Sequence, residues 1–322
     1  MTGPLRWQKL GKIFDPGQHP LPRGCIGWAQ SPQALVLEDV VRIFFSTRST
    51  DATGKFLSHP VFVDLDRDLT RVRRVAPRPV MTLGKLGCFD EHGIFPLNVL
   101  PTPHGLYGYT CGWSRRTSVS VETAIGLAIS HDDGETFARV GDGPVMAATL
   151  REPYLVGDSF VRLVGDRFHM WYIFGTAWRR PDSASAPERI YKIAHATSDD
   201  GRNWRREEGH QIVTDKLGPQ EAQALPAVIE TGGRFHMLFC YRESVDFRTG
   251  VGRGYRLGYA WSEDLATWTR DDGQAPSLGG AGEWDSEMMC YPHLFQCDGR
   301  IYALYNGNEF GRHGFGAAVL DV

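Results

Sequence analysis

Three glutamates occupy equivalent places along this chain, because each one precedes a proline by five residues. They are Glu91 before Pro96, Glu221 before Pro226 and Glu287 before Pro292. Carboxyl groups that converge on a small space repel one another and lose hydration, so the pKa of one rises while another stays ionised. An acid that donates a proton, beside a carboxylate that attacks or activates water, is the pair that cleaves a glycosidic bond.

Asp90 is the expected base or nucleophile of such a pair. It lies in Phe89–Gly93, a short polar turn between apolar stretches that aims it at the shared space. Glu287 or Glu221 is then the expected acid, and Asp158, near the equivalent position of another segment, is the fourth catalytic candidate. The alternative is that a repeated carboxylate is only a structural device that accepts backbone N–H bonds.

Basic and aromatic residues mark the same places. Arg48 and Arg242 each end an apolar segment, and an arginine there can pair with a carboxylate or hold an anionic or polyhydroxy ligand. We expect Arg48 to contact one of the carboxylates. Trp284, between two acidic residues, is the best candidate for stacking on a sugar. The remaining substrate-binding candidates are His92, Asp285, Tyr291 and His293.

The elements that would position these residues recur along the chain. One turn is repeated as Asp133–Phe137, Asp200–Trp204 and Asp264–Trp268, and the final aromatic residues lie 67 and then 64 positions apart. Hairpins with a glycine turn follow in phase with these repeats. A period near 65 residues divides a chain of 322 residues into five units.

Five units that can each hold four strands predict an all-β fold, a single five-bladed β-propeller over residues 1–322. The segment Trp7–Phe14 is similar to the segments that follow Trp204 and Trp268, so we expect it to complete the last blade and cover its open edge. The first strand of each blade would line a central channel, with the preceding loops around its mouth. Two β-sandwich domains, the competing architecture, predict no shared period.

Composition and charge narrow the function further. A formal net charge of −3 offers no basic surface for nucleic acid, and no apolar run is long enough to span a membrane. The N-terminal residues have no secretory signal, which predicts a cytoplasmic protein with its six cysteines reduced. The expected chemistry requires no cofactor. Alternatively, the site near His293 at the channel axis binds calcium, held among carboxylates and carbonyls.

The chain resembles the five-bladed propeller superfamily of arabinanases, levansucrases and invertases. Within it, three segments resemble a bacterial group of glycosyl-hydrolase-like propellers met among polysaccharide or secondary-metabolite biosynthesis genes. These segments are Phe89–Gly93, Trp284–Pro292 and Leu304–Asn308. The resemblance implies a sugar or sugar-like small molecule as the partner.

The chain also departs from the enzymes of that superfamily. The resemblance implies an Asp as general base before the first proline, where this chain has Ser31, and an acid in the fourth blade, where it has Ala224. Asp158 does match the aspartate that modulates the pKa of the acid. Either catalysis has moved to other carboxylates, or hydrolysis has been lost.

Three functions therefore stay open. The leading one is a glycoside-hydrolase-like enzyme that acts on a sugar or sugar-like biosynthetic intermediate by carboxylate acid/base catalysis in the central funnel. The second is a non-hydrolytic enzyme that cyclises, eliminates or isomerises such a molecule with the same groups. The third is a carbohydrate-binding propeller without chemistry, because a fold does not fix a function.

Overall fold

The computed structural model describes residues 4–182 and 185–321, and nearly all of its regular structure is β-strand. The strands come in consecutive groups of four, and within each group sequence neighbours pair antiparallel. The first group is β2 (Gln30–Val36), β3 (Val40–Thr50), β4 (Phe56–Asp66) and β5 (Val72–Val75). The second is β6 (Gly93–Thr102), β7 (Gly105–Arg115), β8 (Val121–Ser130) and β9 (Ala138–Arg139).

The next two groups repeat the pattern. The third group is β10 (Val156–Val164), β11 (Arg167–Arg179), β12 (Glu188–Ser198) and β13 (Arg205–Arg206), and the fourth is β14 (Ala222–Thr231), β15 (Arg234–Arg242), β16 (Arg256–Ser262) and β17 (Thr269–Arg270). The last group contains β18 (Cys290–Cys297), β19 (Arg300–Asn306), β20 (Phe315–Asp321) and the N-terminal strand β1 (Arg6–Phe14). Short 3-10 turns lie at Pro16–Gln18, Asp272–Gln274 and Asn308–Gly311.

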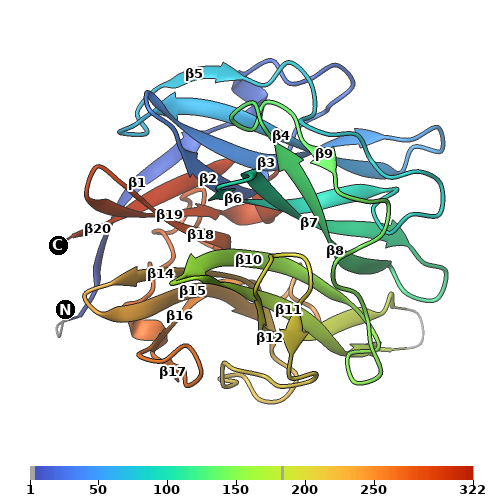
Figure 1. Ribbon diagram of the computed structural model, residues 1–322. Coiled ribbons are helices and arrows are strands. Elements are labelled where there is room, and N and C mark those ends of the chain that lie inside the picture. The colour runs from blue at the N-terminus through green and yellow to red at the C-terminus, as the bar shows by residue number, and fades with distance from the viewer. Residues whose placement is uncertain (1–3, 183–184, 322) are drawn as a thin grey trace.

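The groups follow one another around the molecule. The first strand of each group contacts the first strand of the next, and β18 contacts β2, so these contacts run in a cycle. A single parallel pair, Ser58 with Gly93, joins the first two groups into one eight-stranded sheet. Figure 1 shows the blue first group and the yellow third group on opposite sides of the molecule, with the red last group between them.

The aromatic residues of the repeated turns pack each group against the preceding one. Phe137 meets Phe44 edge-on with ring centroids 5.8 Å apart, and Trp204 meets Tyr109 at 5.9 Å. Trp268 meets Trp171 in the same way at 6.3 Å. Edge-to-face aromatic pairs add to the stability that the buried area provides. The period seen in the sequence is therefore a period of packing between neighbouring groups.

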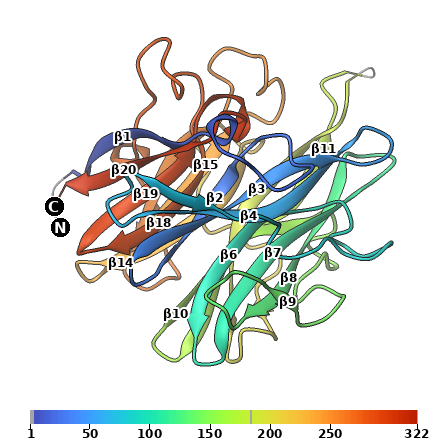
Figure 2. The same cartoon turned by 90° about the horizontal axis from the view of Figure 1, so that it is seen from above.

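The N-terminal strand completes the last group, as predicted. Strand β1 pairs antiparallel with β20, in a register that places Trp7 opposite Leu320. The indole N–H of Trp7 donates to the carbonyl of Gln274 at 2.9 Å. The two ends of the chain lie side by side in both views (Figures 1 and 2).

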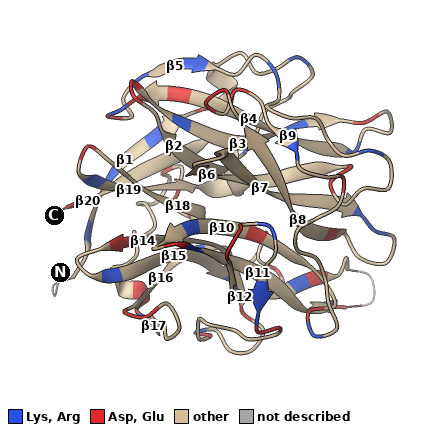
Figure 3. Ribbon diagram, viewed as in Figure 1, with Lys and Arg blue, Asp and Glu red and all other residues tan. Residues whose placement is uncertain are grey.

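Figure 3 shows Lys and Arg interspersed with Asp and Glu over the loops and strand ends. In the described residues, no helix is long and apolar enough to cross a membrane.

Candidate functional site

Each first strand carries a β-bulge near its start, and these bulges shape one end of the structure. The strand register shifts at Gln30/Gln33, Ile94/Leu97, Gly157/Phe160, Ala224/Ala227 and Cys290/His293. Four of the bulges hold a residue other than glycine with positive φ, namely Ser31, Asp158, Leu225 and Tyr291. Such backbone costs on the order of 1–3 kcal/mol and is concentrated at functional sites. A bulge also redirects a side chain, which here brings Asp158 and Tyr291 to a shared cavity.

A cavity of about 620 Å³ lies beside these bulges, and residues from all five groups line it. We call it the arginine pocket, because four arginines line it: Arg48, Arg189, Arg242 and Arg248. Two carboxyl groups line it as well, those of Asp158 and Glu309. Its walls are largely aromatic, with Trp28, Phe56, Phe95, Trp113, Phe247 and Phe310 among them. The volume suits a small organic ligand.

Asp158 is a buried acid at this pocket, with 8 % of its surface exposed. Burial raises the pKa of Asp158 to about 7, although the charge of Arg189 and hydrogen bonds from the Cys111 thiol and the Leu225 N–H oppose the rise. Gly157 makes the close approach of Cys111 possible, since a Cβ there would lie 2.7 Å from its sulfur. A pKa near 7 is the value that suits a general acid or base at neutral pH.

Arg242 is the most buried cation of the pocket, with 1 % of its surface exposed. It donates to the carbonyls of Glu243 and Ser244 at 2.7 and 3.2 Å and to the Tyr191 hydroxyl at 3.1 Å. Its guanidinium stacks 3.6 Å from the Phe247 ring centroid. The Nε atom is buried and has no hydrogen-bond partner among the residues that the structure describes.

Arg48 lines the pocket, but its contacts differ from the expected ones. Its Nε donates to Gln30 Oε1 at 3.1 Å, and its guanidinium lies 4.6 and 4.9 Å from the ring centroids of Trp28 and Phe56. In residues 4–182 and 185–321 no carboxylate lies within ion-pair distance of Arg48. The expected carboxylate contact is absent there because aromatic faces and an amide surround the guanidinium instead.

Three tyrosines add hydroxyl groups to the pocket. The hydroxyls of Tyr191 and Tyr255 contact each other, and the Tyr291 ring packs against Phe95 and Tyr255 with centroids 5.2 and 5.7 Å apart. Burial raises the pKa of Tyr255 and of Tyr291 well above the usual range. These hydroxyls therefore stay protonated near neutral pH and can donate to a ligand.

The structure brings four of the sequence-based candidates together at the pocket: Arg48, Asp158, Arg242 and Tyr291. The other seven do not line it. They are Asp90, His92, Glu221, Trp284, Asp285, Glu287 and His293.

Asp90, Glu221 and Asp285 belong instead to a recurring buried ion pair. In each group but the first, a buried carboxylate that precedes the first strand pairs with a cation on the outermost strand. The pairs are Asp90 with Arg139 at 2.6 Å, Glu152 with Arg206 at 3.0 Å, Glu221 with Arg270 at 2.6 Å and Asp285 with Lys9 at 2.7 Å. Each carboxylate ties the loop before the first strand to the edge of its own group, so these acids face away from the shared cavity.

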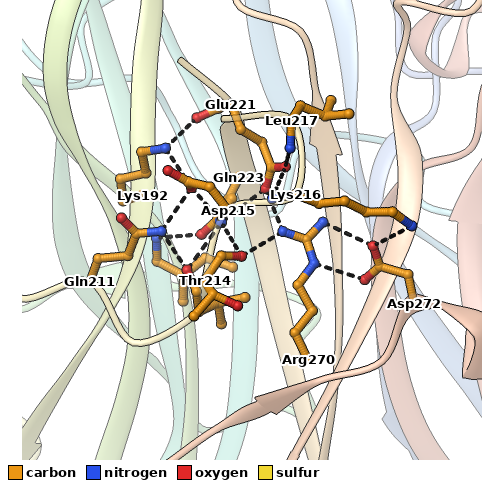
Figure 4. A network of polar contacts seen from close by, with 12 residues as sticks. Lys192, Gln211, Thr214, Asp215, Lys216, Leu217, Glu221, Gln223, Arg270 and Asp272 are labelled. Carbon is orange, nitrogen blue, oxygen red and sulfur yellow. Dashed lines mark hydrogen bonds and ion pairs between the residues drawn. The ribbon is translucent and has the colours of Figure 1, made fainter. Parts of the chain in front are cut away.

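Figure 4 shows the Glu221 pair with its surroundings. Glu221 Oε1 accepts from Arg270, while Oε2 accepts the backbone N–H groups of Lys216 and Leu217 at 2.8 and 2.9 Å. Arg270 also binds both oxygens of Asp272, at 2.9 and 3.0 Å. A carboxylate with this many donors is fixed in one orientation.

The remaining candidates have structural partners. His92 lies 3.1 Å from Glu91 and stacks on Trp113, one ring removed from the pocket. Trp284 stacks on Tyr305 at 5.3 Å, and Glu287 is exposed. His293 packs against Phe160 and Phe295, with ring centroids 5.6 and 6.3 Å away, and burial lowers its pKa to about 3, so the imidazole is neutral. These surroundings fit a packing role for His92, Trp284 and His293, whereas Glu287 faces solvent.

No metal cluster is formed by the described side chains: no group of three or more His, Cys, Asp or Glu in that part of the chain could hold an ion. The ring of His293 lies among apolar rings, whereas calcium prefers oxygen ligands. Calcium at the channel axis stays a prediction from the sequence.

The ion pair of the N-terminal strand gives a stability prediction. Lys9→Met leaves the buried Asp285 carboxylate with the Tyr305 hydroxyl at 3.0 Å as its remaining side-chain donor. We expect the free energy of unfolding to fall by about 1–3 kcal/mol, measured by urea denaturation. Lys12→Met on the same strand removes an exposed pair with Asp15 and should change it by less than about 1 kcal/mol. Equal effects of the two substitutions would contradict the structural role of Asp285.

The sequence analysis missed several residues of the pocket, chiefly Arg189, Tyr191, Arg248, Tyr255 and Glu309. Arg248 and Glu309 lie in the loops that join the second and third strands of the fourth and the last group. The ion pairs did leave a signal. The cations Arg139, Arg206, Arg270 and Lys9 each follow an aromatic residue of the repeat by two positions.

The fold is that of glycoside hydrolases. The chain is similar to a solved BT0996 RGII complex (TM-score 0.72, 16 % identity, 98 % of this chain and 92 % of that one). It is similar to an endo-arabinase of Bacteroides thetaiotaomicron (TM-score 0.61, 12 % identity, 94 % and 97 %). It is also similar to a family GH32 β-fructofuranosidase of Bombyx mori (TM-score 0.60, 15 % identity, 91 % and 60 %). These are propeller enzymes, so the predicted resemblance is confirmed for the fold.

No protein-family model matches the chain. The chain belongs to the same family as two uncharacterised proteins of Mycobacterium tuberculosis, MT1551 of strain CDC 1551 / Oshkosh and Rv1502 of strain H37Rv. Each is 31 % identical over 326 residues, which cover 98 % of this chain and 100 % of the relative.

Proposed function

We propose that this protein is a glycoside-hydrolase-like enzyme whose five strand groups are the blades of a propeller and whose active site is the arginine pocket. The observation that carries the proposal is Asp158, a buried acid on a strained bulge whose pKa is raised to about 7. Enzymes tune a general acid in this way by burial, and perturbed acids of this kind concentrate in active sites. The glycoside hydrolase fold supports a sugar or sugar-like substrate, for which a biosynthetic intermediate is our proposal.

Asp158 and Glu309 are the carboxyl groups that the described residues bring to the pocket, and their surroundings differ. Hydrogen bonds from His313 and Arg312 lower the pKa of Glu309, whereas burial raises that of Asp158. When the pKa values of two carboxyl groups are shifted in opposite directions, the group with the raised pKa usually donates the proton and the other stays ionised. Asp158 would protonate the leaving oxygen of the substrate, and Glu309 would activate water or stabilise positive charge at the sugar.

This assignment replaces the roles that the sequence suggested for Asp90, Glu221 and Glu287. Asp90 and Glu221 are held in buried ion pairs away from the pocket, and Glu287 is exposed outside it. Ser31 remains in the place of the arabinanase-type base, which supports a changed mechanism. A cytoplasmic location and the absence of nucleic-acid and membrane partners remain part of the proposal.

A second candidate function is a non-hydrolytic conversion, such as an isomerisation or elimination, of a sugar-like molecule. The aromatic walls favour it, because a pocket that excludes water lets one group remove and return a proton. Oxygen-18 water distinguishes the two functions. The protein is incubated with a library of oligosaccharides and glycosides, and products are followed by mass spectrometry.

Hydrolysis predicts a product with one oxygen-18 atom. A product without the label would replace our proposal with the second candidate. Binding without any product would favour a carbohydrate-binding protein and contradict both enzymatic functions.

A further inference from the structure

The pocket holds one buried arginine, Arg242, and two half-buried arginines, Arg48 and Arg189, and none of the three forms an ion pair with an acid of the described chain. The other buried cations of the described chain are paired with carboxylates. Arg42, for example, binds both oxygens of Asp64 at 2.8 and 2.9 Å, and Arg270 binds both Glu221 and Asp272. A buried charge without a partner is costly, which explains the general rule of pairing.

Six charged groups line the pocket, and two of them are neutralised by partners that do not line it. Arg248 forms an ion pair with Glu188, and Glu309 forms an ion pair with Arg312 at 2.9 Å and a hydrogen bond with His313 at 3.2 Å. Asp158 is the acid that remains. Against it stand Arg48, Arg189 and Arg242, and in the described part of the chain no carboxylate lies within ion-pair distance of any of the three. The uncompensated charge of the pocket is therefore positive.

The arginines also lie close to one another. Burial lowers the pKa of Arg48, and the positive charge of Arg248 adds to the effect. Arg189 and Arg242 are neighbours, because the Arg242 guanidinium donates to the Arg189 backbone carbonyl at 3.4 Å. Like charges held together in a partly desolvated space are stabilised when an anion binds between them. Within the described residues, the buried Nε of Arg242 has no hydrogen-bond acceptor.

We infer that the arginine pocket binds a sugar that carries an oxyanion, either a carboxylate or a phosphate, with Arg48, Arg189 and Arg242 as the anion-binding residues. The guanidinium fork matches both oxyanions, and the aromatic faces of Trp28 and Trp113 suit the sugar ring. A volume of about 620 Å³ is far larger than an inorganic ion needs, so the anion is part of a larger molecule. This inference rests on the proposed function and specifies its substrate class.

Isothermal titration calorimetry at low and constant ionic strength tests the inference. The ligands are glucuronate, galacturonate, glucose 6-phosphate, neutral glucose and inorganic phosphate, and the arms separate a sugar acid from a sugar phosphate. We expect at least one charged sugar to bind at least about tenfold more tightly than glucose, and more tightly than inorganic phosphate. Arg48→Gln should weaken that binding about tenfold or more, because it removes one guanidinium from the site.

Arg116→Gln is the matched control, since it removes the same charge from an exposed residue that pairs with Glu122 outside the pocket. Equal affinity for charged and neutral sugars would overturn the inference, as would equal losses in the two variants. Inorganic phosphate that binds as tightly as the best charged sugar would also overturn it. Arg48 is partly exposed, so its replacement leaves the buried contacts of Arg242 in place.

The outcome is distinguishable from a failure of the proposed function. Selective binding of a charged sugar without turnover would support the inference and contradict the enzyme. Hydrolysis of neutral glycosides that Arg48→Gln leaves unchanged would support the enzyme and overturn the inference.

Discussion

Asp158→Asn is expected to lower turnover by a factor on the order of 10²–10⁴, the usual contribution of a general acid or base. The amide has nearly the same shape as the carboxyl group but cannot donate or accept the transferred proton. Single-turnover kinetics on the substrate identified by mass spectrometry measures the effect. Turnover that remains at the wild-type level would remove Asp158 from the mechanism.

The same substitution should stabilise the protein at alkaline pH. The pKa of Asp158 is about 7 in the folded protein and 3.8 as its ordinary value, so the folded state holds the proton more tightly. The wild-type protein therefore loses stability as the pH rises from about 4 to about 7, by about 4 kcal/mol at most. Asparagine does not ionise, so the variant does not lose this stability. The difference in the free energy of unfolding between the variant and the wild type should therefore be larger at pH 8 than at pH 5.

Chemical denaturation at the two pH values measures this difference. Asp166→Asn, in the exposed turn between β10 and β11, is the control and should show no such dependence on pH. A gain in stability together with a loss of turnover is the expected signature of a buried catalytic acid, because active sites sacrifice stability for function. The same difference at both pH values would contradict the raised pKa.

Arg270→Met is expected to lower the free energy of unfolding by about 3–5 kcal/mol, because it leaves the Glu221 carboxylate buried without its cation. Glu221 is fully buried, and Arg270 is the cation within ion-pair distance of it in the part of the chain that the structure describes. Glu221→Gln removes the negative charge of the same ion pair. In the double variant Glu221→Gln/Arg270→Met the loss should be smaller than the sum of the two single losses.

Turnover separates this structural role from the catalytic role that the sequence suggested. The folded fraction of Glu221→Gln should keep turnover close to that of the wild type, since Glu221 does not line the arginine pocket. A loss of turnover at unchanged stability would restore Glu221 as a catalytic residue and contradict the location of the active site.

The fold could be predicted from the sequence because the repeated residues make the same packing contact in successive strand groups. Phe137, Trp204 and Trp268 are in phase because each fills the same space between neighbouring groups. The role of the segment Trp7–Phe14 was predictable for the same reason, since it replaces the strand that the last group lacks. Ser159 and Pro292, which occupy equivalent places in their strands, lie within the bulges directly after Asp158 and Tyr291, which explains why these two residues were found.

The pairing of the repeated acids could not be predicted from spacing alone. Glu221 and Arg270 are separated by 49 residues, and only the geometry of four adjacent strands brings them together. The repeated acids suggested catalysis because carboxylates are common catalysts, whereas their partners are the cations that lie two residues after each aromatic residue of the repeat. Arg248 and Glu309 lie in the loops from β15 to β16 and from β19 to β20, outside the repeated turns and hairpins, so the period of the sequence did not point to them.

The central claim is that Asp158 holds an exchangeable proton near neutral pH inside the arginine pocket. Carbon-13 NMR of the aspartate side-chain carboxyl groups, titrated from pH 3 to pH 9, tests it most directly, with the Asp158 signal assigned by its loss in Asp158→Asn. We predict a midpoint of about 7 for Asp158. A midpoint near the ordinary value of 3.8 would show a permanently ionised carboxylate at neutral pH and would contradict the claim.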